Sequence, residues 1–594
     1  MRWKRDGKDL IYSSFPTKIQ QFNQEWTGLD NTFSSYQSQL QEIMWNLAPR
    51  RGEFQTSDAD QGNKRNANIL DSSGLNDVST MKAGLTMGIM NPASEWIHLT
   101  TKNRAIRNLE SVKTWLADEL QEMRADMAGS NLYNECPNLL GDTAIFATGA
   151  MFIEKDWEHV FSVTVFPIGS YRVAFDKDGY PVLVMRKFPM TCRQLVTTFG
   201  MEDGKISEDQ IDWSKFSVSV KDAWDNNKRD TYKVDVMHRI GMNHDFRSNA
   251  LNSKYKRVHG CYYEYSTGAK SDGAAAADIY LREEGYDYFP VLVPCWDKNS
   301  TDSYGTNSLG MVALADAKQL AYQTLTGMRA KDRAFNPATQ TDASMDGEPI
   351  SLVPGHNTFV SNLEKNGGIR PIYNVNPYID QMRLDIQDTR AILARDLLAD
   401  LFLMMSNDDR AQPRTAAEIY ERKSEKLLML GPAYGRFEKY FLRPLVQIIF
   451  NIRMEMGRVN PAPPEMEGQE LEIEFMSIMS MAMKMAGIER NDKIIQTLVT
   501  LQPIIPEVVD TVDEVILMGD MGDKLNLKNG IIRTPEKIVQ RRQARQQAEA
   551  AAAQAETLEK ASVTAKNLSQ APLDNDSVLS EMLQQSKVGS AVPT

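Results

Sequence analysis

The N-terminal part of the chain carries hydrophobic side chains at helical spacing in three separate segments. The first covers residues 15–48 and ends at a proline, which cannot continue a helix. The second covers residues 78–90 and contains Gly84 and Gly88, which would let another helix approach closely. The third covers residues 111–127. This pattern predicts three N-terminal helices.

From about residue 140 the spacing of hydrophobic positions changes from helical to alternating. Short runs rich in β-branched and aromatic residues occupy residues 161–167, 171–175, 181–185, 234–240 and 258–265. Residues 176–179, Asp-Lys-Asp-Gly, have the composition of a hairpin turn. We therefore predict a β-rich region over residues 140–295.

Two long helical patterns then flank an irregular segment. Residues 309–333 predict one helix, which is closed by Asn336-Pro337, and residues 378–405 predict a second. Between them, two short runs at 350–353 and 369–373 have strand-like composition. The pattern predicts a helix–insert–helix hairpin.

The C-terminal part is predicted to be mostly helical. A helical stretch is expected to begin at a capping box, Thr415-Ala-Ala-Glu418, and to end near Met456. A strand at 471–475 and helices over 477–518 follow. A last helix is expected to begin at Thr534-Pro535. The continuation of this last helix to residue 560 is rich in Ala, Gln, Glu and Arg. The final stretch of about 30 residues is polar, and we expect it to fray.

Composition and charge exclude several classes of protein. The chain has 594 residues, 42% of them hydrophobic and 25% charged, which excludes a collagen and a fully disordered chain. Its net charge of −12 disfavours tight wrapping of DNA but permits transient contact. The four cysteines are too far apart for a CxxC motif, and the longest apolar run, 397–405, is too short to span a membrane. We expect a reduced, soluble, intracellular protein.

No catalytic or metal-binding motif is complete. The stretch Gly200–Ile206 resembles a phosphate-binding loop, but its glycines are misspaced and the magnesium-binding hydroxyl is missing. None of the six histidines belongs to an HExxH motif, and there is no GxSxG motif. Asp408-Asp409 lies in a polar loop, which favours a solvated turn over a metal site. We expect no enzymatic activity, no catalytic residue, no cofactor and no metal.

Three clusters keep two interpretations each. The methionines between 476 and 485 can fill a core or form an adaptable subunit interface. Arg541, Arg542 and Arg545 form a solvated helix face or a nucleic-acid patch. The alanine run 548–555 makes a weak helix alone, whereas copies of it could pack closely in an oligomer.

Several stretches resemble the portal, or head-to-tail connector, family of short-tailed double-stranded DNA phages. The matching stretches are Tyr36-Gln-Ser-Gln-Leu-Gln-Glu-Ile up to Pro49, Asp71-Ser-Ser-Gly up to Trp96-Ile-His-Leu, Gly141-Asp-Thr-Ala-Ile-Phe-Ala-Thr-Gly, Arg193 to Phe199-Gly200, Tyr304-Gly-Thr-Asn-Ser-Leu-Gly-Met, Asn336-Pro, Pro354-Gly355 and Arg414-Thr-Ala-Ala-Glu-Ile419. No single motif is specific, but their order over residues 15–530 is.

The resemblance implies an α+β fold that is mostly helical, with a β-rich wing, long stem helices around a small α/β clip, and a helical crown. The implied regions are a wing at 1–304, stem helix 1 at 305–337, a clip at 338–377, stem helix 2 at 378–405, a tunnel loop at 406–414, a wing return at 415–476, a crown at 477–530 and a C-terminal helical extension or barrel with a flexible tail at 531–594.

The resemblance also implies the function and the partners. Members of the family form a homo-oligomeric ring, typically a dodecamer, at one capsid vertex of the virion, after assembly in the host cytoplasm. Double-stranded DNA passes through the ring during packaging and ejection. The implied protein partners are the terminase large subunit, tail adaptor or head-completion proteins, and the major capsid and scaffolding proteins, with no membrane involved.

The candidate site residues follow from the same resemblance. The tunnel loop facing DNA would contribute Asn407, Asp408, Asp409, Arg410, Gln412 and Arg414. Arg383, Arg390 and Arg395 on the second stem helix could line the lumen, although Arg383 and Arg390 could instead pair with Asp388 or with acids of a neighbouring subunit. A different virion ring, such as a tail adaptor, and an enzyme with an unrecognised site are the alternatives.

Overall fold

The structure is a computed structural model in which two compact units are distinguished, residues 1–486 and residues 487–594. The described residues are 18–54, 69–107, 109–201, 211–248, 252–265, 279–299, 302–335, 338–340, 370–371, 379–406, 430–477, 480 and 535–569.

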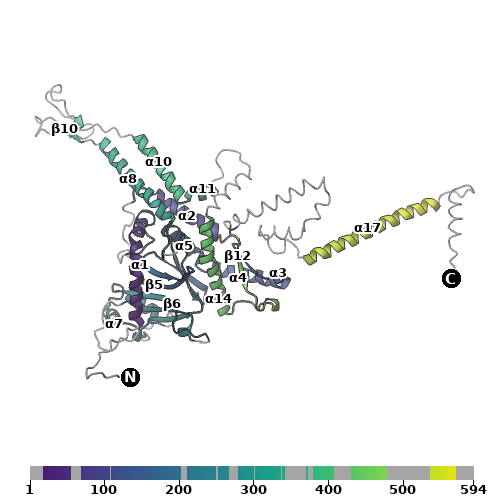
Figure 1. Cartoon of the computed structure of the whole chain (residues 1–594), viewed down its shortest axis with the longest axis horizontal. Coiled ribbons are helices and arrows are strands. Elements are labelled where there is room, and N and C mark those ends of the chain that lie inside the picture. The colour runs from purple at the N-terminus through teal and green to yellow at the C-terminus, as the bar shows by residue number, and fades with distance from the viewer. Residues whose placement is uncertain are drawn as a thin grey trace, which may run out of the picture. The chain divides into compact units, whose positions relative to one another are not determined.

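Helices make up the N-terminal part of the first unit (Figure 1). The three predicted helices are present as α1 (Lys18–Leu47), α2 (Ser73–Ile89) and α4 (Glu110–Gly129), and a short α3 (Arg104–Arg107) precedes α4. A further helix, α5 (Leu132–Phe146), was not predicted. Ten of its fifteen residues are buried, and a helix buried on nearly all sides lacks the polar face that makes helical periodicity visible.

The predicted β-rich region is confirmed, but it begins at residue 150 rather than at residue 140. One antiparallel sheet has the strand order β4-β5-β6-β7-β8, and a smaller sheet has the order β3-β2-β9. The strands are β2 (Ala150–Asp156), β3 (Val160–Phe166), β4 (Tyr171–Phe175), β5 (Pro181–Thr191), β6 (Lys233–Met242), β7 (Val258–Glu264), β8 (Arg282–Tyr286) and β9 (Val291–Leu292).

The predicted hairpin between β4 and β5 is also confirmed. The amide of Asp176 donates to the carbonyl of Tyr180, and Gly179 adopts a φ of +85°, which suits a residue without a side chain. Two short helices, α6 (Cys192–Phe199) and α7 (Val218–Asp225), follow β5 and pack a small core of their own. Gly200, from the phosphate-loop-like stretch, ends α6, and residues 202–206 lie outside the described residues.

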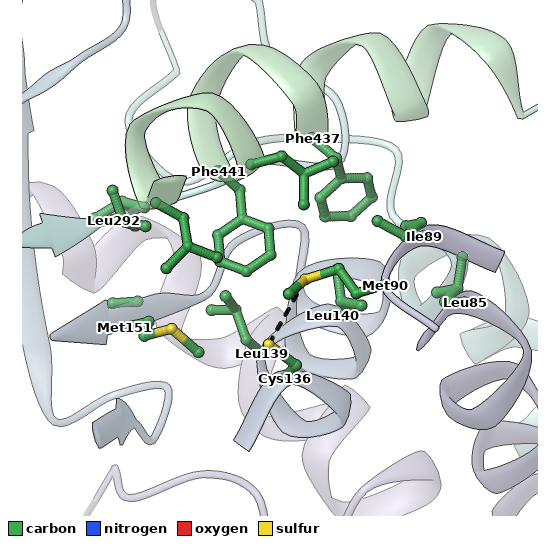
Figure 2. Close-up of a cluster of buried hydrophobic side chains, with 14 of the residues drawn as sticks. Leu85, Ile89, Met90, Cys136, Leu139, Leu140, Met151, Leu292, Phe437 and Phe441 are labelled. Atoms are coloured by element: carbon green, nitrogen blue, oxygen red, sulfur yellow. Dashed lines mark hydrogen bonds between the residues drawn. The ribbon is translucent and has the colours of Figure 1, made fainter. Parts of the chain in front are cut away.

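The main hydrophobic core lies where helices from both ends of the unit meet the smaller sheet. Figure 2 shows part of it, with Phe437 and Phe441 above Leu139 and Leu140 of α5. Cys136 packs its sulfur 3.8 Å from that of Met90 in the same cluster. All four cysteines are buried, and none of them forms a disulfide.

The helix–insert–helix pattern is present with one correction. Helix α8 (Leu309–Phe335) agrees with its predicted range. The second helix is not continuous, because α10 (Ile379–Asp396) ends in a turn at residues 397–398 and α11 (Ala399–Ser406) starts a new direction. Between α8 and α10, β10 (Thr339–Gln340) pairs with β11 (Arg370–Pro371), which lies within the predicted strand 369–373. The predicted strand at 350–353 lies outside the described residues.

The rest of the first unit returns to its N-terminal part. Helix α13 (Gly431–Phe437) continues through one π-helical turn (Glu438–Leu442) into α14 (Arg443–Glu455). Strand β12 (Leu471–Phe475), which was predicted, pairs with β1 (Ile97–Thr101), which was not. Short 3-10 turns are at Trp213–Lys215, Ser253–Tyr255 and Pro464–Met466.

A buried charge network holds α14 against α4. Arg453 is 1% exposed, and its guanidinium donates to Glu122 at 2.6 Å, to Glu119 at 3.3 Å and to Asp126. Such a buried cation needs all of its acidic partners, since leaving it unpaired would be costly.

In the second unit the described residues form one helix, α17 (Pro535–Ser569). It confirms the predicted last helix, and Arg541, Arg542 and Arg545 are exposed on it. The predicted helices over 477–518, apart from residues 477 and 480, lie outside the described residues, as do the capping box at Thr415 and the final residues after 569. So do Met479, Met481, Met483 and Met485, whereas Met476 is buried.

Candidate functional site

The candidate site is the pair of long helices α8 and α10, which run side by side away from the sheets (Figure 1). The first turn of α8 is anchored in the core. The hydroxyl of Ser308 donates to the carbonyl of Ile145 at 2.7 Å and accepts the amide of Met311 at 3.0 Å. Gly310 lies so close to Ile145 that a β-carbon there would be 2.3 Å from its carbonyl oxygen. The start of α8 therefore depends on α5, the buried helix.

Small and polar side chains join α8 to α10 along their length. The hydroxyl of Thr389 donates to the Gln323 side chain at 3.0 Å, and Met382 packs over Gly327. Nearer the core, Leu320 and Leu393 are both buried. These contacts pair the two helices. Helix α8 also packs against α1 and α5, and α10 against α2.

Several large hydrophobic side chains of this pair are exposed in the described part of the chain. Tyr322 is 71% exposed and Leu384 is 51% exposed. Together with them, the exposed apolar residues of α8 and α10 are Val312, Met328, Phe335 and Ile392. Single exposed hydrophobic residues are common, but a set of six on two adjacent helices is typical of an interaction surface.

Cations also lie along the two helices. Arg329, Lys331 and Arg333 are exposed on the last two turns of α8, and Arg383 is exposed on α10. At the other end of α10, Arg390 donates to Asp71 at 2.7 Å and 3.1 Å. The Arg390 side chain is 49% exposed, whereas that of Asp71 is 6% exposed.

The electrostatics of Asp71 explain this pairing. Burial favours the protonated form of Asp71, but hydrogen bonds from Ser73 and from Arg390 outweigh it and hold the pKa of Asp71 below its ordinary value. Arg390 therefore stabilises a carboxylate that would otherwise be costly to bury.

Other carboxyl groups gather where α10 meets the core. Burial raises the pKa of Asp77 on α2 to about 6, and the carboxylates of Asp71 and Asp400 act in the same direction. Burial also raises the pKa of Asp396, the last residue of α10, as does its contact with the carboxyl of Asp316 on α8. The Arg395 guanidinium, 3.8 Å from Asp396, opposes this rise.

The part of the chain that the structure describes contains no cluster of three or more metal-ligating side chains. His238 is buried and its ring stacks on that of Tyr262. Burial lowers the pKa of His238 well below its ordinary value, and the positive charges of Arg186 and Arg282 lower it further. None of the described helices has the length and apolar character needed to cross a membrane.

Residues 19–532 match the family model described as "Bacteriophage head to tail connecting protein". The chain belongs to this family. It is a head-to-tail connector, or portal, protein of a phage and a component of the virion, and proteins of this kind are structural.

Two relatives match this connector over nearly their whole length. This chain is 32% identical to the portal protein of Salmonella phage epsilon15 over 556 residues. The alignment covers 93% of this chain and 95% of the relative. This chain is 31% identical over 557 residues to the probable portal protein of Bordetella phage BPP-1, which covers 94% and 96%.

Solved structures match the connector more distantly. A chain from the neck of an empty GTA particle aligns with a TM-score of 0.30 and 9% identity, over 80% of this chain and 91% of that one. A chain from the virion of a native gene transfer agent particle aligns with a TM-score of 0.27 and 11% identity, over 72% and 88%. At these TM-scores the likeness supports no conclusion about this chain.

The structure separates the site residues that the sequence grouped together. Arg383 and Arg395 are exposed on α10, whereas Arg390 pairs with Asp71 instead of with Asp388. The tunnel-loop residues Asn407, Asp408, Asp409, Arg410, Gln412 and Arg414 lie outside the described residues.

Sequence reasoning missed the acids around the base of α10 and the exposed apolar residues of this connector's two helices. Asp71 and Asp77 lie far from α10 in the sequence, so no local pattern links them. Tyr322 and Leu384 lie on helices that were already predicted, but no pattern in the sequence marks them as exposed. The exposed cations at the end of α8 could have been found, since they alternate at positions 329, 331 and 333.

Proposed function

We propose that this connector assembles as a closed ring, a homododecamer, at one capsid vertex and that double-stranded DNA passes through its central channel during packaging and ejection. The observation that carries the proposal is the set of exposed apolar residues on α8 and α10. A surface of one subunit that binds a different surface of the next gives a ring when the rotation closes. Packing against a neighbouring copy would bury this set.

The regions of the subunit take the roles that the family resemblance implies. We assign residues 1–304 and 415–476 to the wing, 305–337 and 378–405 to the stem, 338–377 to the clip, 406–414 to the tunnel loop, 477–530 to the crown and 531–594 to a C-terminal extension. The side-by-side packing of α8 and α10, with β10 and β11 between them in the sequence, supports the stem and the clip. The long α17 supports a helical extension.

The net charge of −12 supports a channel in which DNA slides. A lumen that paired strongly with phosphates would hold the duplex, because counterion release makes such binding tight. A few cations are enough to keep the duplex centred. We assign this role to Arg410 and Arg414 of the tunnel loop and to Arg383 and Arg395 of α10, which are exposed. The ring would further dock the terminase large subunit, tail adaptor or head-completion proteins, and the capsid and scaffolding proteins.

Native mass spectrometry and negative-stain electron microscopy of the purified chain test the ring directly. We expect closed rings of about a dozen 67.1 kDa subunits with a central hole. Replacing two exposed stem residues, Tyr322→Glu with Leu384→Glu, should shift the population to monomers, because a charge in an apolar interface is costly to desolvate. Val218→Glu, at an equally exposed position on α7, is the matched control and should leave rings intact. Rings that persist in the double variant would contradict the assignment of this surface to the interface.

A further inference from the structure

The junction between α10 and α11 is a sharp bend held from both sides. Helix α10 ends at Asp396 and α11 begins at Ala399, and Leu398 between them has a φ of +58°, a left-handed conformation that is uncommon for leucine. Beyond the bend, the ring of Phe402 packs over Gly84 of α2, where a β-carbon would come within 2.1 Å of it. The strained conformation of Leu398 persists because the side chains on both sides of it, Leu397 and Phe402, are buried, and their packing stabilises the bend.

Each side of the bend brings a carboxyl group of the bent segment toward an acid on another helix. Before the bend, Asp396 meets Asp316 of α8. After it, burial and the negative charges of Asp71 and of Asp400, which lies in the first turn of α11, all favour the protonated form of Asp77 on α2. One oxygen of Asp77 is buried and has no hydrogen-bond partner among the described residues. The docked arrangement therefore holds like charges together on both sides of the bend, between α10 and α8 before it and between α11 and α2 after it.

The other charged groups around the bend do not neutralise both sites. Asp71 adds a third negative charge near Asp77, and the cation next to it, Arg390, is held by Asp71 itself. Near Asp396, Arg395 is 70% exposed and stands 3.8 Å away, too far for a strong ion pair. Since two adjacent carboxylates cannot both ionise at low cost, a proton at each site stabilises the docked arrangement.

We propose that the α10–α11 bend is a proton-coupled hinge, in which protons held between Asp396 and Asp316 and on Asp77 keep α11 docked on α2. Loss of these protons releases α11. Helix α11 ends at Ser406, the first residue of the segment 406–414, so the hinge also sets where that segment begins. That this segment is a tunnel loop rests on the proposed function; the hinge itself does not.

The direction of the pH effect follows from the carboxyl groups. The docked state holds the pKa of Asp77 at about 6, above its ordinary value of 3.8. Docking is therefore strongest at low pH and weakens as the pH rises through about 6. If undocking restores the ordinary pKa of Asp77, this residue lowers the docking equilibrium constant by at most about tenfold between pH 5 and pH 8, and Asp396 acts in the same direction.

Amide hydrogen exchange of the full chain, measured at pH 5 and at pH 8 and corrected for intrinsic exchange rates, tests the hinge. We expect protection of residues 397–406 to fall by up to about tenfold at pH 8, whereas residues 309–320 of α8 keep theirs. The double variant Asp77→Asn with Asp396→Asn should keep its protection at both pH values. Asp388→Asn, an exposed position on the same helix, is the matched control and should behave as the unmodified chain.

Two results would overturn the hinge: equal protection of residues 397–406 at both pH values in the unmodified chain, or an undiminished pH effect in the double asparagine variant. If the double variant loses protection in α8 as well, it has not folded, and each single variant is then expected to show a reduced pH effect. An unreduced effect in both singles would also overturn the proposal. The readout needs neither a ring nor DNA, so its failure leaves the proposed ring standing, and absence of rings leaves the hinge standing.

Discussion

At the scale of single residues, two arginines that look equivalent in the sequence have different surroundings. Arg383 and Arg390 lie seven positions apart on α10, and both are candidates for the lumen. Arg390 donates to Asp71, which is 319 positions away and nearly buried. Arg383 is exposed on the same helix. Arg390 therefore contributes to the stability of the subunit, whatever its exposed half contacts in a ring.

Replacing each arginine by methionine should separate these roles. Arg390→Met should lower the free energy of unfolding by about 1–2 kcal/mol, because the buried Asp71 carboxylate loses its charged partner. Arg383→Met is the control and should change it by less than about 0.5 kcal/mol. Urea denaturation at neutral pH measures both. Equal effects of the two substitutions would contradict the ion pair.

The same pair predicts a pH dependence. The pKa of Asp71 lies below its ordinary value in the folded chain, so its contribution to stability is present above that value and is lost as the pH falls through the folded pKa. The difference in stability between the unmodified chain and Arg390→Met should thus shrink when the pH is lowered below about 4. A difference that grows on acidification would show that Asp71 is not the partner that matters.

At the scale of elements, packing decides where helices end. The uninterrupted apolar pattern over 378–405 predicts one helix, yet the chain bends at Leu398 so that Leu393 and Leu397 on one side and Leu401 and Phe402 on the other are all buried. The bend works only because Gly84 leaves room for Phe402. The sequence pattern correctly indicated a close approach at Gly84, but it could not name the helix that approaches.

Substitutions of two helical glycines test this contact. Gly84→Ala should destabilise the chain by about 1–3 kcal/mol, since the new methyl group overlaps the ring of Phe402. Gly28→Ala in α1 is the matched control: nothing lies within 4 Å of its β-carbon position, so it should stabilise the helix by about 0.5–1 kcal/mol. Thermal and urea unfolding report both. A neutral Gly84→Ala would mean that α11 does not pack here.

At the scale of the whole molecule, the first unit is closed by contacts between its two ends. Strand β12 pairs with β1, which joins Ile97 to Phe475, and Arg453 of α14 is buried among acids of α4. The exposed apolar residues of α8 and α10 have no such partner within the described chain. In the proposed ring, a neighbouring copy of the connector would cover these residues.

The proposed tunnel loop leads to a prediction about the assembled particle. Arg410→Glu with Arg414→Glu should sharply reduce packaged DNA while rings still form, because the two cations would face the duplex and not the neighbouring subunit. Lys177→Glu with Lys228→Glu, two exposed cations of the proposed wing, makes the same charge change and should package normally. Packaged DNA is quantified from purified particles. Unchanged packaging in the tunnel-loop variant would remove Arg410 and Arg414 from the channel.

Much of the fold could be predicted because it rests on local signals. Alternating positions and a turn of Asp-Lys-Asp-Gly predicted β4 and β5, and prolines after residues 48 and 336 predicted the ends of α1 and α8. Helix α5 could not be predicted in this way, because it is buried nearly all round and shows no polar face. Strand β1 was missed because its five residues pair with a strand far away in the sequence.

The sequence by itself determined most of the long helices, the β-rich region, the helix–insert–helix arrangement and the resemblance to head-to-tail connectors, since these depend mainly on residues close together along the chain. Only the tertiary structure decided the bend at Leu398, the partner of Arg390 and the carboxyl groups that meet around α11. These features depend on residues from α2, α8 and α10 that come together only on folding, where burial makes like charges costly and an exposed apolar face informative.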